Sequence, residues 1–583
     1  MTVEFVERAL TGPGFGTVRR RVLRQLLESL IYEQAIDLEE IGPCRYRVAG
    51  KEVSYEFTAF RRHGFARVGL GRDPVLRIAG ATEEAESALR FLHETRDVIK
   101  ADPDCLERFA RELARTEFND ALAQAARAER GDVLAESDYD RLECAVTDGH
   151  RYHPTYKSRM GFDSEDNVAF GPEFAPGVRP LWLAARRSIA EVSSVPDVAE
   201  SAYLRDQLGE TYDEFVRRAD PAEYTYLPVH PWQWREVVSG AFAEQLACGD
   251  IVVLGEDPEQ FLPQQSIRTL SCDGRPYLKL ALSIVNTSTR RELAPHTVAN
   301  APRISGWLRE VVDGDPFLRE ECRLILLGEV MGTAVSTDTA SGDTAIVSGD
   351  TEGTLSCIWR ENLHDQLEAG EQAVPFNGLT ACEADGTPLI DRWVRRLGLA
   401  EWLRQLVDVS VLPVIHLLCR HGIAVESHAQ NMVLVHAGGV PTRVALKDFH
   451  DGVRFSRAEL AEPRRCPELR ATPEHHGNRN SFVETDDLGL VADFVLDAFF
   501  FINIGELGIF LGDAYAFDER EFWAIVRERI GAYRQRFPEL AERFATFDVT
   551  KPCIDVEKLT SRRLLPDTEL RLHTVPNPLA EEG

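Results

Sequence analysis

The chain has 583 residues, of which 44% are hydrophobic, so it is long enough for two or three domains of ordinary globular composition. Its formal net charge of −29 argues against a nucleic-acid-binding protein, because such proteins are normally basic. The 11 cysteines are odd in number and include no C-x-x-C pair, which favours a reduced, cytoplasmic compartment over a disulfide framework.

The sequence gives no sign of a membrane partner. The N-terminal residues MTVEFVERALTG carry acidic side chains and no apolar core, so we expect no signal peptide. The most apolar stretch, residues 494–511, is interrupted by Asp497, Asn503 and Glu506. A buried helix is therefore expected there rather than a membrane span.

Residues 1–140 are predicted to form a small mixed domain without a dense cluster of chemically active residues. Apolar residues recur with a helical period over residues 15–36. Residues 46–80 are expected to form short strands, because Val53, Tyr55 and Phe57 alternate with polar residues, and residues 84–130 return to amphipathic helices.

The pattern changes after residue 140 and indicates a mixed α+β fold. Short apolar runs at 251–254, 277–284 and 324–327 predict strands, and residues 333–354, rich in Gly, Ser, Thr and Asp, predict a surface hairpin or flap. Further on, the sequence predicts an apolar helix at 402–420 and strands at 432–435 and 444–449, joined by a turn at Gly438 and Gly439. The last 100 residues are expected to be mainly helical.

The sharpest local motif is HGIAVESHAQNMVLV, residues 421–435, followed by LKDFHDG, residues 446–452. His428, Gln430 and Asn431 precede the predicted hairpin, and Asp448 ends its second strand. Kinases use such an Asn and Asp to hold Mg²⁺ against ATP phosphates, since Mg²⁺ prefers oxygen ligands. The alternative is a buried polar turn. Glu426 precedes His428 and no Asp occupies the kinase base position, so a kinase mechanism is disfavoured.

A second motif combines SIRTL, residues 266–270, with YLKLALSIVNTSTRREL, residues 277–293. Ser266, Arg268 and Thr269 offer two hydroxyls and a guanidinium, and Thr287 and Arg291 follow in a polar turn. Lys279 lies within an apolar run, where a buried ammonium needs an anion, and ATP phosphate is a natural candidate. The alternative for Lys279 is an edge strand that leaves its amine in solvent.

Two further motifs are DGHRYHPTYKSRMGF, residues 148–162, and LPVHPWQW, residues 227–234. In the first, His150 and His153 lack a third ligand nearby, so an anion-binding loop with Lys157 and Arg159 is favoured over zinc. In the second, His230 and its neighbouring tryptophans form either a stacking surface or a rigid packing corner.

The ordered series GH-x-x-HP-x-x-K-x-R-x-GF, PVHPWQW, S-x-RT, K with R twelve residues later, E-x-H-x-QN and KDFHDG resembles the NRPS-independent siderophore synthetases, the IucA/IucC family. The likeness covers about residues 145–455, and VPNPLA at 575–580 is also similar to the family's C-terminus. The chain departs from the family pattern at Arg151, which stands where the family usually has proline.

The resemblance implies a cupped-hand architecture and a homodimer. The thumb would span 1–140, the fingers 141–375 and a kinase-like, ATP-binding palm 376–583. It implies adenylation of a carboxylate by ATP with Mg²⁺, followed by condensation with an amine or alcohol and release of AMP and pyrophosphate.

The resemblance also implies residue roles. Nucleotide contacts would come from His153, Ser266, Arg268, Thr269, Lys279, Gln430, Asn431 and Asp448, with Asp448 and Asn431 at the metal. Lys157 and Arg159 of the basic loop would join this nucleotide site and meet phosphate or carboxylate. The carboxylate would be bound by Thr287, Arg291, Glu426, His428 and Lys558, and Arg291, His428 and Lys279 would be catalytic.

The charge chemistry agrees with these roles, because ATP and citrate are both polyanions and fixed cations must offset their repulsion. Two alternatives stay open: a kinase-like phosphotransferase acting on a small molecule, and a non-catalytic anion-binding or assembly protein. The carboxylate (citrate, 2-oxoglutarate, or a monoamide of citrate or succinate) and the nucleophile also stay open.

Overall fold

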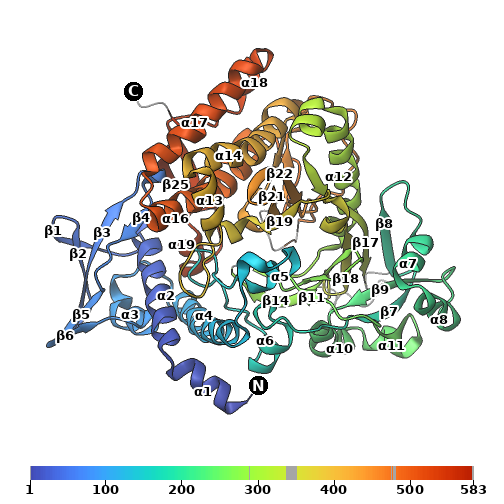
Figure 1. The fold of residues 1–583 in the computed structure, drawn as a ribbon. Coiled ribbons are helices and arrows are strands. Elements are labelled where there is room, and N and C mark those ends of the chain that lie inside the picture. The colour runs from blue at the N-terminus through green and yellow to red at the C-terminus, as the bar shows by residue number, and fades with distance from the viewer. Residues whose placement is uncertain (1, 288, 337–350, 475, 477–480, 581–583) are drawn as a thin grey trace.

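The computed structural model describes residues 2–287, 289–336, 351–474, 476 and 481–580 (Figure 1). Helices and strands are interleaved along the chain, which confirms the predicted mixed fold. Most of the predicted flap at 333–354 falls on residues 337–350, outside the described residues.

The N-terminal part is a six-stranded antiparallel sheet covered by helices, at the left of Figure 1. The strand order is β1-β2-β3-β5-β6, and β4 also pairs with β3. Helix α4 is preceded by the N-cap Asp102, has proline at its first position and is followed by Gly131, whose φ of +64° suits glycine. The elements are α1 (Val3–Thr11), α2 (Pro13–Tyr32), β1 (Glu39–Gly42), β2 (Arg45–Ala49), β3 (Ser54–Arg61), β4 (Val68–Leu70), β5 (Leu76–Ala79), β6 (Ala81–Glu84), α3 (Ala88–Thr95) and α4 (Pro103–Arg130).

The middle part contains a second six-stranded sheet, in the order β11-β12-β13-β18-β17-β8, and a three-stranded sheet, β10-β7-β9. Helix α12 (Pro295–Gly314) lies against β17 so closely that a Cβ on Gly332 would come within 2.7 Å of the Val298 carbonyl oxygen. The strands are β7 (Leu181–Arg186), β8 (Ala190–Ser194), β9 (Tyr224–Val229), β10 (Ile251–Glu256), β11 (Leu262–Pro263), β12 (Thr269–Ser271), β13 (Tyr277–Leu280), β17 (Glu329–Val335) and β18 (Ser356–Arg360), with the separate hairpin β14 (Leu282–Asn286) and β15 (Thr289–Arg291).

The C-terminal part is built on a four-stranded sheet, β16-β22-β21-β19, in which β16 (Ile325–Leu327) runs parallel to β22 (Val440–Lys447). Strands β21 (Met432–Ala437) and β22 confirm the predicted hairpin, and its turn holds Gly438 and Gly439 at positive φ. Strands β16 and β19 (Gln372–Pro375) precede residue 376, so this sheet joins two of the expected parts. The three-part division and the cupped hand stay predictions.

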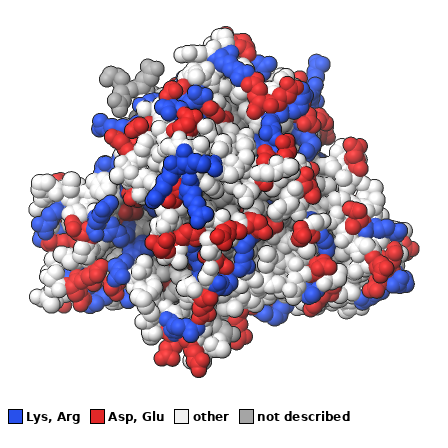
Figure 2. Space-filling view, viewed as in Figure 1, with Lys and Arg blue, Asp and Glu red and all other residues white. Residues whose placement is uncertain are grey.

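Two helical stretches, Leu399–His421 and Leu488–Tyr515, are long and apolar enough to span a membrane, but 72% and 83% of their most apolar windows are buried inside the protein. They are α14 (Leu399–His416) with η10 (Leu417–His421), and α15 (Leu488–Asp493) with η13 (Phe494–Ile504) and α16 (Gly505–Tyr515). The buried helix expected at 494–511 is confirmed. Acidic and basic side chains are interspersed over the face shown in Figure 2.

The remaining elements connect and flank these sheets. They are α5 (Tyr139–Ala145), α6 (Ser164–Phe170), α7 (Glu200–Leu208), α8 (Glu210–Arg218), α9 (Pro231–Gln233), α10 (Ser239–Ala241), α11 (Ala243–Cys248), α13 (Asp391–Leu397), α17 (Glu519–Arg536), α18 (Ala541–Thr546), α19 (Leu559–Leu564), and the strand pairs β20 (Ile423–Val425) with β23 (Val453–Phe455) and β24 (Cys553–Glu557) with β25 (Leu572–Pro576).

Candidate active site

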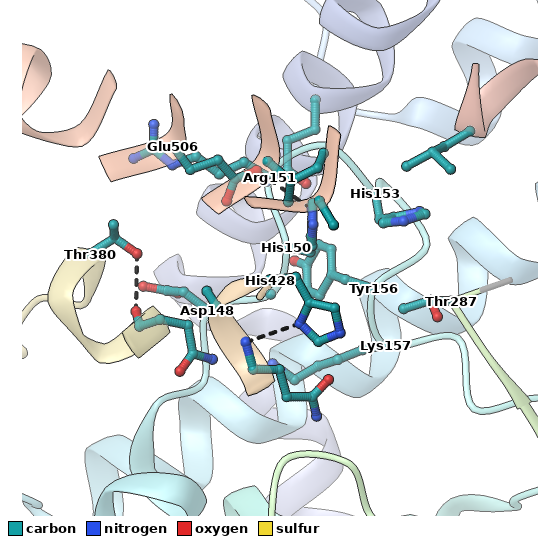
Figure 3. A pocket seen from close by; sticks show the side chains of 18 of the residues that line it. Asp148, His150, Arg151, His153, Tyr156, Lys157, Thr287, Thr380, His428 and Glu506 are labelled. Carbon is teal, nitrogen blue, oxygen red and sulfur yellow. Dashed lines mark hydrogen bonds and ion pairs between the residues drawn. The ribbon is translucent and has the colours of Figure 1, made fainter. Parts of the chain in front are cut away.

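A cavity of about 1600 Å³ lies where the N-terminal, middle and C-terminal parts meet. Its wall combines motifs that are hundreds of residues apart in sequence, and Figure 3 shows His150, His153, Thr287 and His428 around one pocket. The sequence-predicted residues that line it are His153, Lys157, Arg159, Ser266, Arg268, Lys279, Thr287, Arg291, Glu426, His428, Gln430, Asn431 and Asp448.

Two sequence-predicted residues do not line the cavity. Thr269 stands behind Ser266, whose hydroxyl donates to the Thr269 hydroxyl over 2.8 Å. Lys558 lies between the lining residues Glu557 and Leu559, at the start of α19. Their proposed contacts with ligands therefore have less support than those of the lining residues.

Lys279 is held in the centre of a sheet, because β13 pairs with β12 on one side and β18 on the other. Its Nζ lies 3.0 Å from Oδ2 of Asp448, and Arg360 donates to Oδ1 of the same carboxylate over 2.6 Å. This arrangement excludes an exposed edge-strand lysine. Burial lowers the pKa of Lys279 to about 8. Burial would raise the pKa of Asp448, but Lys279 and Arg360 outweigh it and hold that pKa well below its usual range.

Asp448 directly follows β22 and has φ of +68°, a left-handed conformation that Asp tolerates better than most residues. Lys279 and Arg360 stand on neighbouring strands at diagonal positions of the same face, since Lys279 opposes Ile358 and Arg360 opposes Tyr277. The carboxylate of one sheet is thereby fixed between two cations of another.

Arg268 and Arg291 line the cavity without forming an ion pair with a carboxylate of any described residue. Neither has an acidic oxygen within ion-pair distance among the described residues, and both have a buried Nε without a hydrogen-bond acceptor. Burial, followed by the repulsion from Arg268, lowers the pKa of Arg291 to about 10. Two desolvated guanidiniums that repel each other are costly unless an anion binds near them. This pair is the feature of the cavity that most clearly predicts an anionic ligand.

The turn between β14 and β15 positions Arg291. Its Nη2 donates to the Thr287 hydroxyl over 3.2 Å and to the Asn286 carbonyl over 3.4 Å. Thr287 has φ of +62°, which is strained for a β-branched residue and is typical of positions that a site holds in place. Gln233 supports the same hairpin, because its side chain accepts from the Ser283 backbone N–H and donates to the Thr354 carbonyl.

His150, His153 and His428 place three neutral imidazoles in the cavity. Burial lowers the pKa of His428 to about 4 and that of His150 to about 3, and burial together with His150 lowers the pKa of His153 well below its usual range. Nδ1 of His428 accepts a hydrogen bond from the backbone N–H of Gln430 over 3.2 Å. The ring orientation is thereby fixed, with Nε2 available to a ligand.

The residues around Glu426 fit a Mg²⁺ ion. Glu426, Asp448 and Asp451 all line the cavity, and burial together with Asp451 raises the pKa of Glu426 to about 7. Asn431 uses its Nδ2 to donate to the Glu426 carbonyl over 3.1 Å, so its amide oxygen remains for a ligand. Carboxylate and amide oxygens are what Mg²⁺ prefers, and its charge would relieve the repulsion among these acids.

Lys157 and Arg159 lie at the cavity, but protein carboxylates already neutralise them. Lys157 Nζ is 3.1 Å from Asp120 and 3.4 Å from Glu173, and Arg159 donates to Glu173 over 2.6 Å. Both cations are buried. Their predicted contacts with phosphate or carboxylate therefore have less support than those of Arg268 and Arg291, because a buried cation with such partners supports the loop that carries His150 and His153.

The LPVHPWQW segment is a rigid packing corner. His230 and Trp232 are buried and do not line the cavity; Nδ1 of His230 accepts from the Trp232 backbone N–H, and Trp232 donates to Asp166. Arg360, by contrast, was missed by sequence reasoning. Its signal was an arginine at the end of the buried run SCIWR, the same pattern that singled out Lys279.

The IucA / IucC family matches residues 138–381, and a ferric iron reductase FhuF-like transporter family matches residues 400–572. The chain is 40% identical to citryl-spermidine/3,4-dihydroxybenzoyl-citryl-spermidine:spermidine ligase of Bacillus anthracis, over 98% of this chain and 95% of that protein. It is 41% identical to 2-[(L-alanin-3-ylcarbamoyl)methyl]-3-(2-aminoethylcarbamoyl)-2-hydroxypropanoate synthase of Staphylococcus aureus, over 97% of this chain and 93% of that protein.

Among solved structures, the petrobactin biosynthesis protein AsbB of Bacillus anthracis superposes with a TM-score of 0.92 at 39% identity, covering 99% of this chain and 98% of that one. These full-length relatives are ligases or synthases by name. The kinase-like phosphotransferase alternative is not supported by them.

Proposed function

This chain belongs to the IucA/IucC family of siderophore synthetases, and we propose that it is an ATP-dependent ligase. It adenylates a carboxylate of citrate or of a citrate derivative and then joins that carboxylate to an amine. The observation that carries the proposal is the pair of guanidiniums without an ion-pair partner in the described part of the chain, Arg268 and Arg291, in the same cavity as Lys279 and Asp448. We place the reaction in the central cavity.

In the first step a carboxylate oxygen of the substrate attacks the α-phosphorus of ATP, and the bond to the β,γ-diphosphate breaks to release pyrophosphate. Arg268 and Ser266 would bind phosphate oxygens, and Arg291, with Thr287 and His428, would orient the carboxylate. The fixed cations reduce the repulsion between the two anions and hold them in line, which supplies both electrostatic and proximity contributions.

Mg²⁺ fits the same wall, where Asp448 and Asn431, with Glu426 and Asp451 nearby, would hold it. When bound, it would neutralise phosphate charge. Lys279 and Arg360 keep Asp448 ionised and oriented.

In the second step the amine nitrogen attacks the acyl carbon, AMP leaves, and the nitrogen loses a proton. Acidic side chains line another part of the cavity wall, including Asp493 and Asp497. Burial raises the pKa of Asp493 to about 6 and that of Asp497 to about 8, so these desolvated carboxylates favour a cationic partner. An amine substrate with a second ammonium group matches them better than an alcohol, in keeping with the spermidine named for the Bacillus relative.

The proposal is tested by incubating the purified protein with Mg²⁺-ATP and citrate, or a citryl monoamide, and then adding a diamine or polyamine. Pyrophosphate and AMP are expected, together with an amide product. Release of ADP with a phosphorylated substrate would instead support a phosphotransferase, and no carboxylate-dependent turnover with any citrate derivative would leave only an anion-binding protein. We also propose that the protein is cytoplasmic and forms a homodimer. Sedimentation of the purified protein tests the homodimer.

A further inference from the structure

Outside the set of residues that line the cavity, two histidines and an aspartate converge on one point. Asp315 directly follows α12, His416 is the last residue of α14, and His421 ends η10. Oδ2 of Asp315 lies 3.0 Å from Nε2 of His416 and 2.9 Å from Nε2 of His421, and all three atoms lie within 4.8 Å of one another. Among the described residues, this is the group of His, Cys, Asp and Glu side chains whose ligand atoms converge in this way.

Asp315 and His416 each have a second polar atom with a hydrogen-bond partner of its own, and these partners orient the two side chains toward the point of convergence. Oδ1 of Asp315 accepts the backbone N–H groups of Phe317 and Leu318 over 2.9 and 3.2 Å. Nδ1 of His416 lies 2.8 Å from the hydroxyl of Tyr533 on α17. Metal-binding imidazoles commonly have such an outer partner, because it fixes the ring and its tautomer.

Aromatic rings surround His416, whereas the side chain of His421 is partly exposed. The ring of His416 packs against Phe317 and Phe537, with centroid distances of 4.6 and 5.3 Å, and its side chain is 2% exposed. The His421 side chain is 15% exposed. Three protein ligands at a partly open position leave room for a water molecule as a fourth ligand.

We propose that Asp315, His416 and His421 form a binding site for a divalent first-row transition-metal ion, separate from the active site. Ligands about 2.0–2.1 Å from a tetrahedral Zn²⁺ lie about 3.3 Å apart, so the two N–O separations need to open by only a few tenths of an ångström. The two imidazoles and one carboxylate select such ions over Mg²⁺ or Ca²⁺, which prefer oxygen ligands.

Binding requires a proton shift but no redox partner. Without metal, each Nε2–H donates to the same carboxylate oxygen. With metal, Nε2 of each ring donates its lone pair to the ion and the ring proton resides on Nδ1, where that of His416 donates to the Tyr533 hydroxyl oxygen. Asp315 follows α12, His416 and His421 end α14 and η10, and the outer partner Tyr533 lies on α17, so the ion would tie these helices together (Figure 1).

Zinc is the probe that tests the site. Chelator-treated protein is dialysed against Zn²⁺, and bound metal is measured by mass spectrometry in the wild type, in His421→Ala and in Asp315→Asn. His93→Ala serves as the matched control, since His93 is an exposed histidine on α3. The wild type and His93→Ala should bind about one more Zn²⁺ per chain than the two site variants, and only they should show a rise in melting temperature with Zn²⁺.

All four proteins have the same exposed cysteines, so any zinc bound there cancels when the zinc contents of the proteins are compared. Circular dichroism and carboxylate-dependent pyrophosphate release verify that the variants are folded. If a variant does not fold, an anomalous-difference map from a Zn²⁺-soaked wild-type crystal decides the question. Equal zinc content in all proteins, or the lack of an anomalous peak between the three ligand atoms, would overturn the proposal and leave a purely hydrogen-bonded triad.

Discussion

Replacing Arg291 by methionine should remove activity while making the ligand-free protein slightly more stable. Burial lowers the pKa of Arg291 from 12.5 to about 10, which corresponds to about 3 kcal/mol of unfavourable free energy for the charged form at about 1.36 kcal/mol per pKa unit. Arg291 is only partly buried and cavity water screens it, so we expect a gain of about 1 kcal/mol in the free energy of unfolding. Methionine keeps an unbranched apolar stem of similar length.

The loss of activity follows from the same charge. A cation aimed at the reacting carboxylate stabilises the negative charge of the transition state, and removing such a group typically lowers turnover by about 10²–10³-fold. Carboxylate-dependent pyrophosphate release measures this effect, and urea unfolding without ligands measures stability. The neighbouring Arg290→Met is the matched control, because Arg290 is exposed and pairs with Glu292 at the surface.

The two measurements together make the prediction sharp. Arg290→Met should leave both quantities close to the wild-type values, within about 0.5 kcal/mol for stability. The reasoning is refuted if Arg291→Met retains pyrophosphate release close to that of Arg290→Met, or if it is markedly less stable than the wild type. In the first case Arg291 does not act on the substrate, and in the second it has a structural partner.

Three further predictions concern the groups around Asp448. Asp448→Asn should lower the free energy of unfolding by about 3 kcal/mol, because Lys279 and Arg360 lose their buried counter-charge. It should also raise the Mg²⁺ concentration needed for half-maximal pyrophosphate release. An unaltered urea midpoint and an unaltered Mg²⁺ titration would contradict this prediction. Lys279→Ala should abolish pyrophosphate release with the fold retained, and Lys279→Arg should not restore it. Lys100 is exposed, so Lys100→Ala should behave as the wild type. Turnover in Lys279→Ala would remove Lys279 from the site. Glu426 has a folded-state pKa raised from 4.5 to about 7, so its stabilising contribution is complete below about pH 4.5 and is lost as the pH rises through 7. The fall in the free energy of unfolding between pH 5 and pH 8 should therefore be smaller in Glu426→Gln than in the wild type, by about 1–2 kcal/mol. Equal falls in the two proteins would contradict the raised pKa of Glu426.

Local sequence patterns predicted several of the helices and strands and most of the candidate residues that line the cavity. The hairpin of β21 and β22, the buried helix within 494–511 and the strand around Lys279 follow from short-range patterns of apolar residues, turns and caps, which act between near neighbours in the chain. The motif order indicated the family, and most of its polar residues line one cavity.

The partners of the buried charges are evident only from the folded structure. Lys157 and Arg159 look like phosphate ligands in the sequence, but Asp120 and Glu173 reach them from other segments and neutralise them. Lys279 looks like a cation awaiting a ligand, yet Asp448, 169 positions away, is its partner, with Arg360 as the unforeseen third member. The free energy of a buried charge depends on the groups within a few ångströms in space, and sequence separation does not encode that distance.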